Sequence, residues 1–110
     1  MTDAARTHLE VIAPRVTVAS YSDGDVVVEV DEMGGVVFEA AQLRTLRQAL
    51  RHLPEKEFST SLGENKLDEE GYVEYDGSTV SLYDTYPSSS IPLTAEEAAK
   101  LENWLFELGY

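Results

Sequence analysis

The sequence predicts an α+β domain: one mostly antiparallel sheet of about five or six strands, with two amphipathic helices on one face. Three observations lead to this fold class. Two Asp-Gly pairs lie between runs of β-branched and aromatic residues, a strong short-range signal for a hairpin. Two stretches carry apolar residues at helical spacing. The strand and helix signals also recur in the same order at an offset of about 55 residues.

In the first half, valine-rich runs alternate with turn signals at Asp23-Gly24 and Gly34-Gly35. A leucine-spaced stretch follows and stops at Pro54, because proline cannot continue a helix. The expected elements are strands at residues 16–21, 26–30 and 36–38 and a helix at residues 40–53.

The second half repeats this order and begins with an extra strand signal. Its helix has a clear start, because Thr94 and Glu97 form the pattern of a capping box. The expected elements are strands at residues 57–62, 72–75, 78–83 and 91–93 and a helix at residues 95–108.

The two helices carry the repeat most clearly, since each has four apolar residues spaced 3, 4 and 3 apart. Such spacing places all four on one helix face. Any two amphipathic helices share this pattern, so the shared element order is the further support for an internal ββ(β)α duplication. The matching residues are Leu43, Leu46, Leu50 and Leu53 in one helix and Ala98, Leu101, Leu105 and Leu108 in the other.

For the second hairpin, a two-residue turn at Asp76-Gly77 predicts that Tyr75 pairs with Ser78 and Val73 with Val80. This register leaves one apolar and one polar face, as in a sheet covered on one side. We expect the open face of the sheet to be polar, and acidic in its second half.

The chain is expected to form a single domain over residues 14–110, built from pseudo-repeats at 14–54 and 57–110. Residues 1–13 are expected to be a flexible N-terminal segment or a short helix capped by Thr2 or Asp3. The sequence contains no cysteine, no secretory signal and no apolar run long enough to span a bilayer. We therefore expect a cytoplasmic protein.

The net charge of −13 is concentrated in the second half. Residues 57–110 contain 12 acidic and 2 basic residues, a net charge of −10, whereas residues 1–56 contain 9 and 6, a net charge of −3. This charge repels nucleic acid and anionic membranes and attracts basic protein surfaces. General solubility or adaptation to a salty cytoplasm would also explain the acidity.

The densest acidic cluster runs from a loop into the second hairpin and is our candidate partner-binding site. Phe106 and Tyr110 are added to it as exposed aromatic residues near the end of the last helix. Arg44, Arg47 and Arg51 form a basic stripe on the first helix, expected to pair with neighbouring acids or to orient a partner. The acidic candidates are Glu64, Asp68, Glu69, Glu70, Glu74 and Asp76.

No catalytic, metal or cofactor site is expected, because the sequence lacks a nucleophile elbow, a phosphate-binding glycine loop and a calcium-loop motif. The leading hypothesis is a small non-enzymatic module that binds a basic protein partner. Its sharpest form is an inhibitor that mimics nucleic acid, as anti-restriction and anti-CRISPR proteins do. One alternative is a structural protein that self-associates through its helices, for instance as a homodimer. Another is a small-ligand domain with a pocket lined by Tyr72, Tyr83 and Tyr86.

Overall fold

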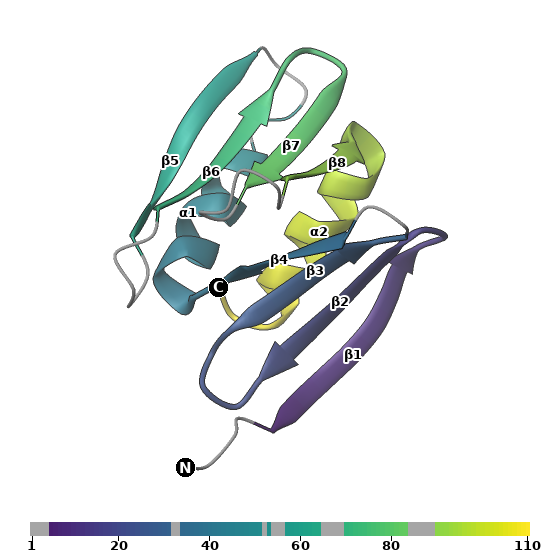
Figure 1. Cartoon of the computed structure of the whole chain (residues 1–110), viewed down its shortest axis with the longest axis vertical. Helices are drawn as coiled ribbons and strands as arrows, with labels where there is room; N and C mark the ends of the chain where they lie inside the picture. Colours follow the sequence, from purple (N-terminus) through teal and green to yellow (C-terminus); the bar gives the residue numbers. More distant parts are fainter. Residues whose placement is uncertain (1–4, 32–33, 52, 54–56, 65–69, 84–89) are drawn as a thin grey trace.

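The computed structural model of the chain describes residues 5–31, 34–51, 53, 57–64, 70–83 and 90–110. These residues form two four-stranded antiparallel sheets, and each sheet is followed in the chain by one helix (Figure 1). The prediction of a single sheet of five or six strands with both helices on one face is therefore wrong. The strand order is β1-β2-β3-β4 in the first sheet and β5-β6-β7-β8 in the second.

Both halves of the chain have the same order of elements, four strands and then a helix. The first half consists of β1 (Arg6–Ala13), β2 (Val16–Tyr21), β3 (Val26–Val30), β4 (Gly34–Phe38) and α1 (Ala40–Leu50). The second consists of β5 (Phe58–Glu64), β6 (Glu70–Tyr75), β7 (Thr79–Tyr83), β8 (Ser90–Thr94) and α2 (Ala95–Glu107).

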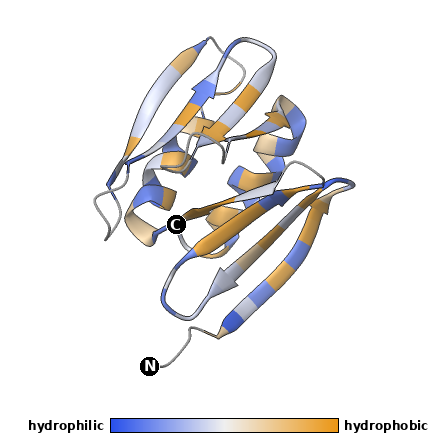
Figure 2. Ribbon diagram, in the orientation of Figure 1, coloured by the Kyte–Doolittle hydropathy of each residue, from blue (hydrophilic) through white to orange (hydrophobic). Residues whose placement is uncertain are grey.

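The N-terminal segment contains a strand and not a helix. β1 pairs with β2 along most of its length, and hydrophilic and hydrophobic residues alternate along part of it (Figure 2). Alternation with period two favours a strand over a helix. The helix considered for this segment therefore does not form.

The second sheet ends at β8, although β4 lies beside it. Pro92 explains part of this boundary, because proline has no N–H to donate and is confined to edge strands within sheets. The carbonyl oxygen of Pro92 accepts a hydrogen bond from Nη2 of Arg15, at 3.2 Å. The edge of β8 is thus bonded to a side chain of the first half.

The helices connect the two halves, because each contacts strands of the other half. α1 packs against β5 and β6, and α2 packs against β1 as well as β7 and β8. The buried residues of both sheets and both helices form one hydrophobic core. Its largest fully buried side chains are Phe38, Leu43, Leu46, Leu82, Ile91, Leu93, Leu101 and Leu105.

Two buried polar side chains at equivalent helix positions also bridge the halves. Gln42 accepts from the backbone N–H of Glu39 and donates to the carbonyl of Gly63 in β5, at 3.0 and 2.9 Å. Glu97 accepts from the N–H of Thr94 at 2.8 Å and pairs with Arg15 at 2.9 Å. The predicted capping box at Thr94 and Glu97 is confirmed. Gln42 and Glu97 lie 55 positions apart, which matches the offset of the leucine pattern.

The register of the second hairpin differs from the prediction by two residues. Tyr75 pairs with Val80 and Val73 with Leu82, so the turn is longer than Asp76-Gly77 alone. The Asp76 carboxylate accepts from the N–H groups of Ser78 and Thr79, at 2.8 and 2.7 Å, and these bonds hold the longer turn together. A shift of two residues preserves the face of every side chain.

Candidate functional site

The outer face of the second sheet carries the acidic residues that the structure brings together. Glu70, Tyr72 and Glu74 of β6 point outward, whereas Val73 and Tyr75 between and beyond them are buried. This follows from the two-residue period of a strand, which sends alternate side chains to opposite faces. The polar face predicted for the second hairpin is therefore present.

Hydroxyl groups hold the two β6 carboxylates in place. Glu70 accepts hydrogen bonds from Ser61, at 2.8 Å, and from the hydroxyl of Tyr72. Glu74 accepts from Ser59 at 3.4 Å and from the Tyr83 hydroxyl at 3.1 Å. Each carboxylate thus lies between a serine of β5 and a tyrosine, and an ionised carboxylate retains capacity for further donors.

These bonds shift the acid–base properties of the pair formed by Glu70 and Tyr72. The Tyr72 and Ser61 hydroxyls donate to Glu70 and lower the pKa of its carboxyl group. The same hydrogen bond raises the pKa of the Tyr72 hydroxyl. Glu70 is therefore anionic and Tyr72 is a neutral donor at neutral pH.

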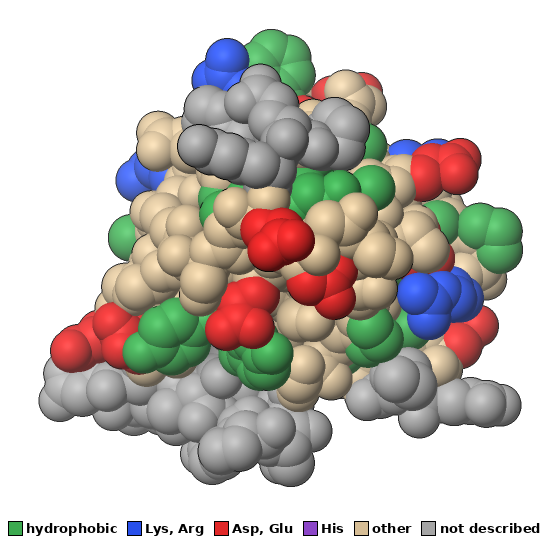
Figure 3. All heavy atoms as spheres, turned by 90° about the horizontal axis from the view of Figure 1, so that it is seen from above, with side chains coloured by type: hydrophobic (Ala, Val, Ile, Leu, Met, Phe, Trp, Pro, Cys, Tyr) green, Lys and Arg blue, Asp and Glu red, His purple; other side chains and the backbone are tan. Residues whose placement is uncertain are grey.

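Glu64 at the end of β5 lies directly opposite Glu70 at the start of β6. Facing positions on adjacent strands lie close together, so the two carboxyl groups concentrate acidic side chains at this end of the sheet. Figure 3 views this end of the molecule from above: acidic side chains cluster near the middle, and basic ones lie toward the rim. Among the described residues of β5–β8 there is no Lys or Arg.

Asp76, another predicted site residue, does not lie on this face. Asp76 uses its carboxylate in the hairpin turn, where the N–H groups of Thr79 and Ser78 lower its pKa. Asp68 and Glu69 lie outside the described residues.

Phe106 and Tyr110 belong to a different part of the surface. Phe106 is 59% exposed, as its helical position predicts, and the guanidinium carbon of Arg47 lies 4.6 Å from the centre of its ring. Arg47 also approaches Glu102 at 3.6 Å. Tyr110 packs partly against the core, and its hydroxyl donates to the carbonyl of Gly24 at 3.0 Å. Burial also raises the pKa of Tyr110. Because Tyr110 is partly buried and Phe106 is exposed, the two aromatic residues do not form one exposed pair.

Sequence reasoning missed an apolar row on the outer face of the first sheet. Leu9, Ala19, Val27 and Val37 face one another across β1 to β4. Leu9 is 55% and Val37 is 44% exposed. The open face is thus apolar in the first sheet, and only the second sheet has the predicted acidic one. The uninterrupted run of valines at residues 26–28 is a signal for a strand that is apolar on both faces.

The structure does not support a specific metal centre in its described part, where no three His, Cys, Asp or Glu residues are arranged to hold an ion. No helix within the described ranges is long and apolar enough to cross a membrane. Tyr72 and Tyr83 bind carboxylates on the sheet surface, and Tyr86 falls outside the described residues.

Comparisons with protein-family models, with curated proteins and with solved structures gave no match. The function is therefore argued from the geometry of the surface, because a fold alone does not specify an activity.

Proposed function

We propose that this chain is a non-enzymatic protein-binding module that presents the outer face of β5–β7 to a basic surface of another protein. The observation that carries the proposal is the facing pair Glu64 and Glu70, with Glu74 further along the same face. A cation of a partner that approaches two facing carboxylates is attracted by both of them.

The hydroxyl contacts of this face also favour binding. Glu70 and Glu74 are already oriented by serine and tyrosine hydroxyls, so less side-chain entropy is lost when a partner binds. Tyr72 and Tyr83 add aromatic surface, and tyrosine is enriched in protein interfaces.

A finer form of the proposal is an inhibitor that occupies a basic nucleic-acid-binding site. Glu70 and Glu74 are four residues apart on β6, or about 13 Å along the strand. One strand of a DNA duplex presents about four phosphates over that length. Glu64 lies beside Glu70 on the neighbouring strand, so the carboxylates of this face match the two ends of such a phosphate tract, and Tyr72 lies between them on β6.

The test is a pull-down from cells of the source organism or its host, with two charge-matched variants as parallel baits. One bait replaces Glu64, Glu70 and Glu74 by glutamine, and the control bait carries Glu29→Gln, Asp31→Asn and Glu57→Gln. We expect a partner that wild type and control retain, that the face variant loses, and that salt releases, because charge interactions are screened within about 8 Å at physiological ionic strength.

Equal retention of every captured protein by both variant baits would refute the proposed face. For the inhibitor form, the captured protein must be a nucleic-acid-binding enzyme, and added DNA or RNA must compete with the module for it. If nucleic acid does not displace the partner, the proposal of a binding module stands and its inhibitor form is excluded.

A second candidate function is self-association through the apolar row of the first sheet. The row places exposed apolar side chains on a face with few charged neighbours among the described residues, namely Arg6, Glu29 and Asp31. In a chain of net charge −13, a face with little net charge is where two copies repel least, so the occupant that this candidate function assigns to it is a second copy. Sedimentation should show a dimer that dissociates on Leu9→Ser with Val37→Thr; a monomeric wild type at high concentration excludes this function.

A further inference from the structure

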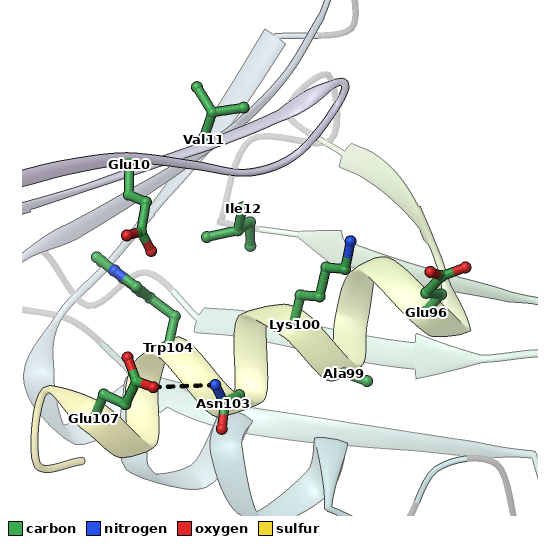
Figure 4. A pocket seen from close by; sticks show the side chains of 9 residues that line it. All are labelled: Glu10, Val11, Ile12, Glu96, Ala99, Lys100, Asn103, Trp104 and Glu107. Atoms are coloured by element: carbon green, nitrogen blue, oxygen red, sulfur yellow. Dashed lines mark hydrogen bonds between the residues drawn. The ribbon is translucent and has the colours of Figure 1, made fainter.

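A groove runs between β1 of the first sheet and α2, whereas the acidic face lies on the second sheet. It has a volume of about 520 Å³. Figure 4 shows Glu10 and Ile12 pointing from β1 into the groove and Val11 pointing away from it. The remaining lining residues come from α2: Glu96, Ala99, Lys100, Asn103, Trp104 and Glu107.

β1 forms one wall of this groove and is an edge strand. In the part of the chain that the structure describes, it pairs with β2 and has no strand on its other side. Residues Arg6 to Val11 are exposed on both faces of the strand. Such an edge offers backbone N–H and C=O groups to an added strand, a common mode of peptide recognition.

The groove is acidic, which determines what kind of segment can occupy it. Three glutamates and one lysine line it, giving a local net charge of −2. Glu107 is oriented by the side-chain amide of Asn103, at 3.2 Å. The carboxylates of Glu10 and Glu96 have no hydrogen-bond or ion-pair partner among the described residues. Charge complementarity therefore favours a basic occupant over a neutral or acidic one.

Trp104 closes the inner end of the groove. Its ring is directed toward β1, and the carboxylate of Glu10 points back toward it (Figure 4). Only 5% of Trp104 is exposed, so it provides an apolar floor. It is also the single tryptophan of the chain, which makes its fluorescence a local reporter of the groove.

We propose that this groove binds an extended, lysine- or arginine-rich segment of another protein, which adds to the free edge of β1 as a fifth strand. Alternate side chains of the added strand face α2, where cations meet Glu10, Glu96 and Glu107. The intervening side chains lie on the same side of the sheet as Val11. This site is separate from the acidic face of the second sheet.

The test is a titration of the full chain with an eight-residue peptide of alternating lysine and threonine, which matches the length of β1. Trp104 fluorescence should change saturably at low salt. Two control peptides have glutamate in place of lysine, or N-methyl groups on alternate backbone nitrogens. Neither control should bind, because one lacks the charge and the other cannot form the strand ladder.

Variants then locate the site. Glu10→Lys together with Glu107→Lys should weaken binding at least fivefold, since each exposed charge pair contributes modestly and reversal adds repulsion. Glu107→Lys also places a cation at a helix C-terminus, where it is favourable. The matched control Glu29→Lys, on the outer face of the same sheet, should bind as wild type does. Glu70→Gln tests whether the peptide binds the acidic face of the second sheet in place of the groove.

Three results would overturn the inference. These are no saturable change up to about 1 mM peptide, equal binding of the N-methylated peptide, and unchanged binding by the Glu10 and Glu107 double variant. A dimer that forms without peptide and is lost on N-terminal truncation of β1 would instead assign this edge to a second copy. If only Glu70→Gln loses binding, the peptide binds the acidic face of the second sheet and not the groove.

Discussion

Replacing Glu97 by alanine removes three hydrogen bonds, of which two connect the second helix to Arg15 in the first half of the chain and one caps the helix at Thr94. One carboxylate oxygen accepts from the N–H of Thr94 at 2.8 Å and from Nη2 of Arg15 at 2.9 Å. The other accepts from Nε of Arg15, also at 2.9 Å. Residue 97 is almost fully buried, so water cannot readily replace these partners.

The size of the effect follows from these contacts. Two charge-assisted bonds contribute about 1.5 kcal/mol each and the capping bond about 1 kcal/mol. The higher helix propensity of alanine and the partial exposure of Arg15 reduce this sum. We expect a loss of about 3 kcal/mol in the free energy of unfolding. For 110 residues the unfolding entropy converts this loss to a fall of about 13 °C in Tm.

Urea unfolding followed by Trp104 fluorescence measures this loss, and a double-mutant cycle with Arg15→Ala isolates the pair. The coupling energy of the cycle should be about 2 kcal/mol. Glu97→Gln is the matched control, because it places at residue 97 the amide that Gln42 supplies in α1, and it should lose about 1 kcal/mol. A loss below about 1 kcal/mol for Glu97→Ala, or additive single variants, would refute the reasoning.

The pH dependence provides an independent check of the same side chain. Burial raises the pKa of Glu97, but the hydrogen bonds from Arg15 and Thr94 and the charge of Arg15 outweigh it. The folded pKa therefore lies below the ordinary value of 4.5. A lowered folded pKa stabilises the protein above that value, and the stabilisation is lost as pH falls through the folded pKa. The stability difference between wild type and Glu97→Gln should shrink below pH 4.5; a constant difference would contradict this.

Three further predictions test packing elsewhere. Gly71→Ala should cost about 1 to 3 kcal/mol in urea unfolding, because the added Cβ would lie 3.0 Å from the Phe38 ring; a neutral effect would mean that the ring yields. Arg47→Met together with Glu102→Met should change stability by less than about 1 kcal/mol or raise it, because the pair is replaced as a unit. The Arg47 Nε approaches Glu102 at 3.6 Å but is buried without a hydrogen-bond partner in the described structure, and the methionine stem keeps contact with Phe106. A Tm fall above about 10 °C would contradict this. Asp76→Ala should lower the urea midpoint by releasing two turn N–H groups, and Asp76→Asn should recover most of this loss; an equal loss in both variants would contradict the role of the turn bonds.

Local signals predicted most of the secondary structure. Leucine spacing located both helices, and the predicted ranges 40–53 and 95–108 compare with Ala40–Leu50 and Ala95–Glu107. The capping box at Thr94 and Glu97 could be read directly, because it depends on residues three apart. The same locality explains the correct faces of the second hairpin.

Long-range features were not predictable in this way. Nothing in residues 6–13 separates an edge strand from a flexible segment until β2 is placed beside it, and β1 is exposed on most of its length. The bridge from Arg15 to Glu97 spans 82 positions, and the one from Gln42 to Gly63 depends on how the halves dock. The candidate site was also predictable only in part. That Glu70 and Glu74 share one face follows from strand alternation, whereas the position of Glu64 opposite Glu70 depends on the bulged register of β5.

The sequence by itself determined the elements from residue 16 onward, the faces of the second hairpin and of the helices, and the excess of acid in the second half. These depend on side-chain period, turn chemistry and composition, which are local or additive properties. Only the tertiary structure decided that the strands form two sheets, that the helices contact both halves, and that one open face is apolar and the other acidic. The physical reason is that strand edges pair through backbone groups that are alike at nearly every residue, so the choice of neighbour depends on the packing of the whole chain.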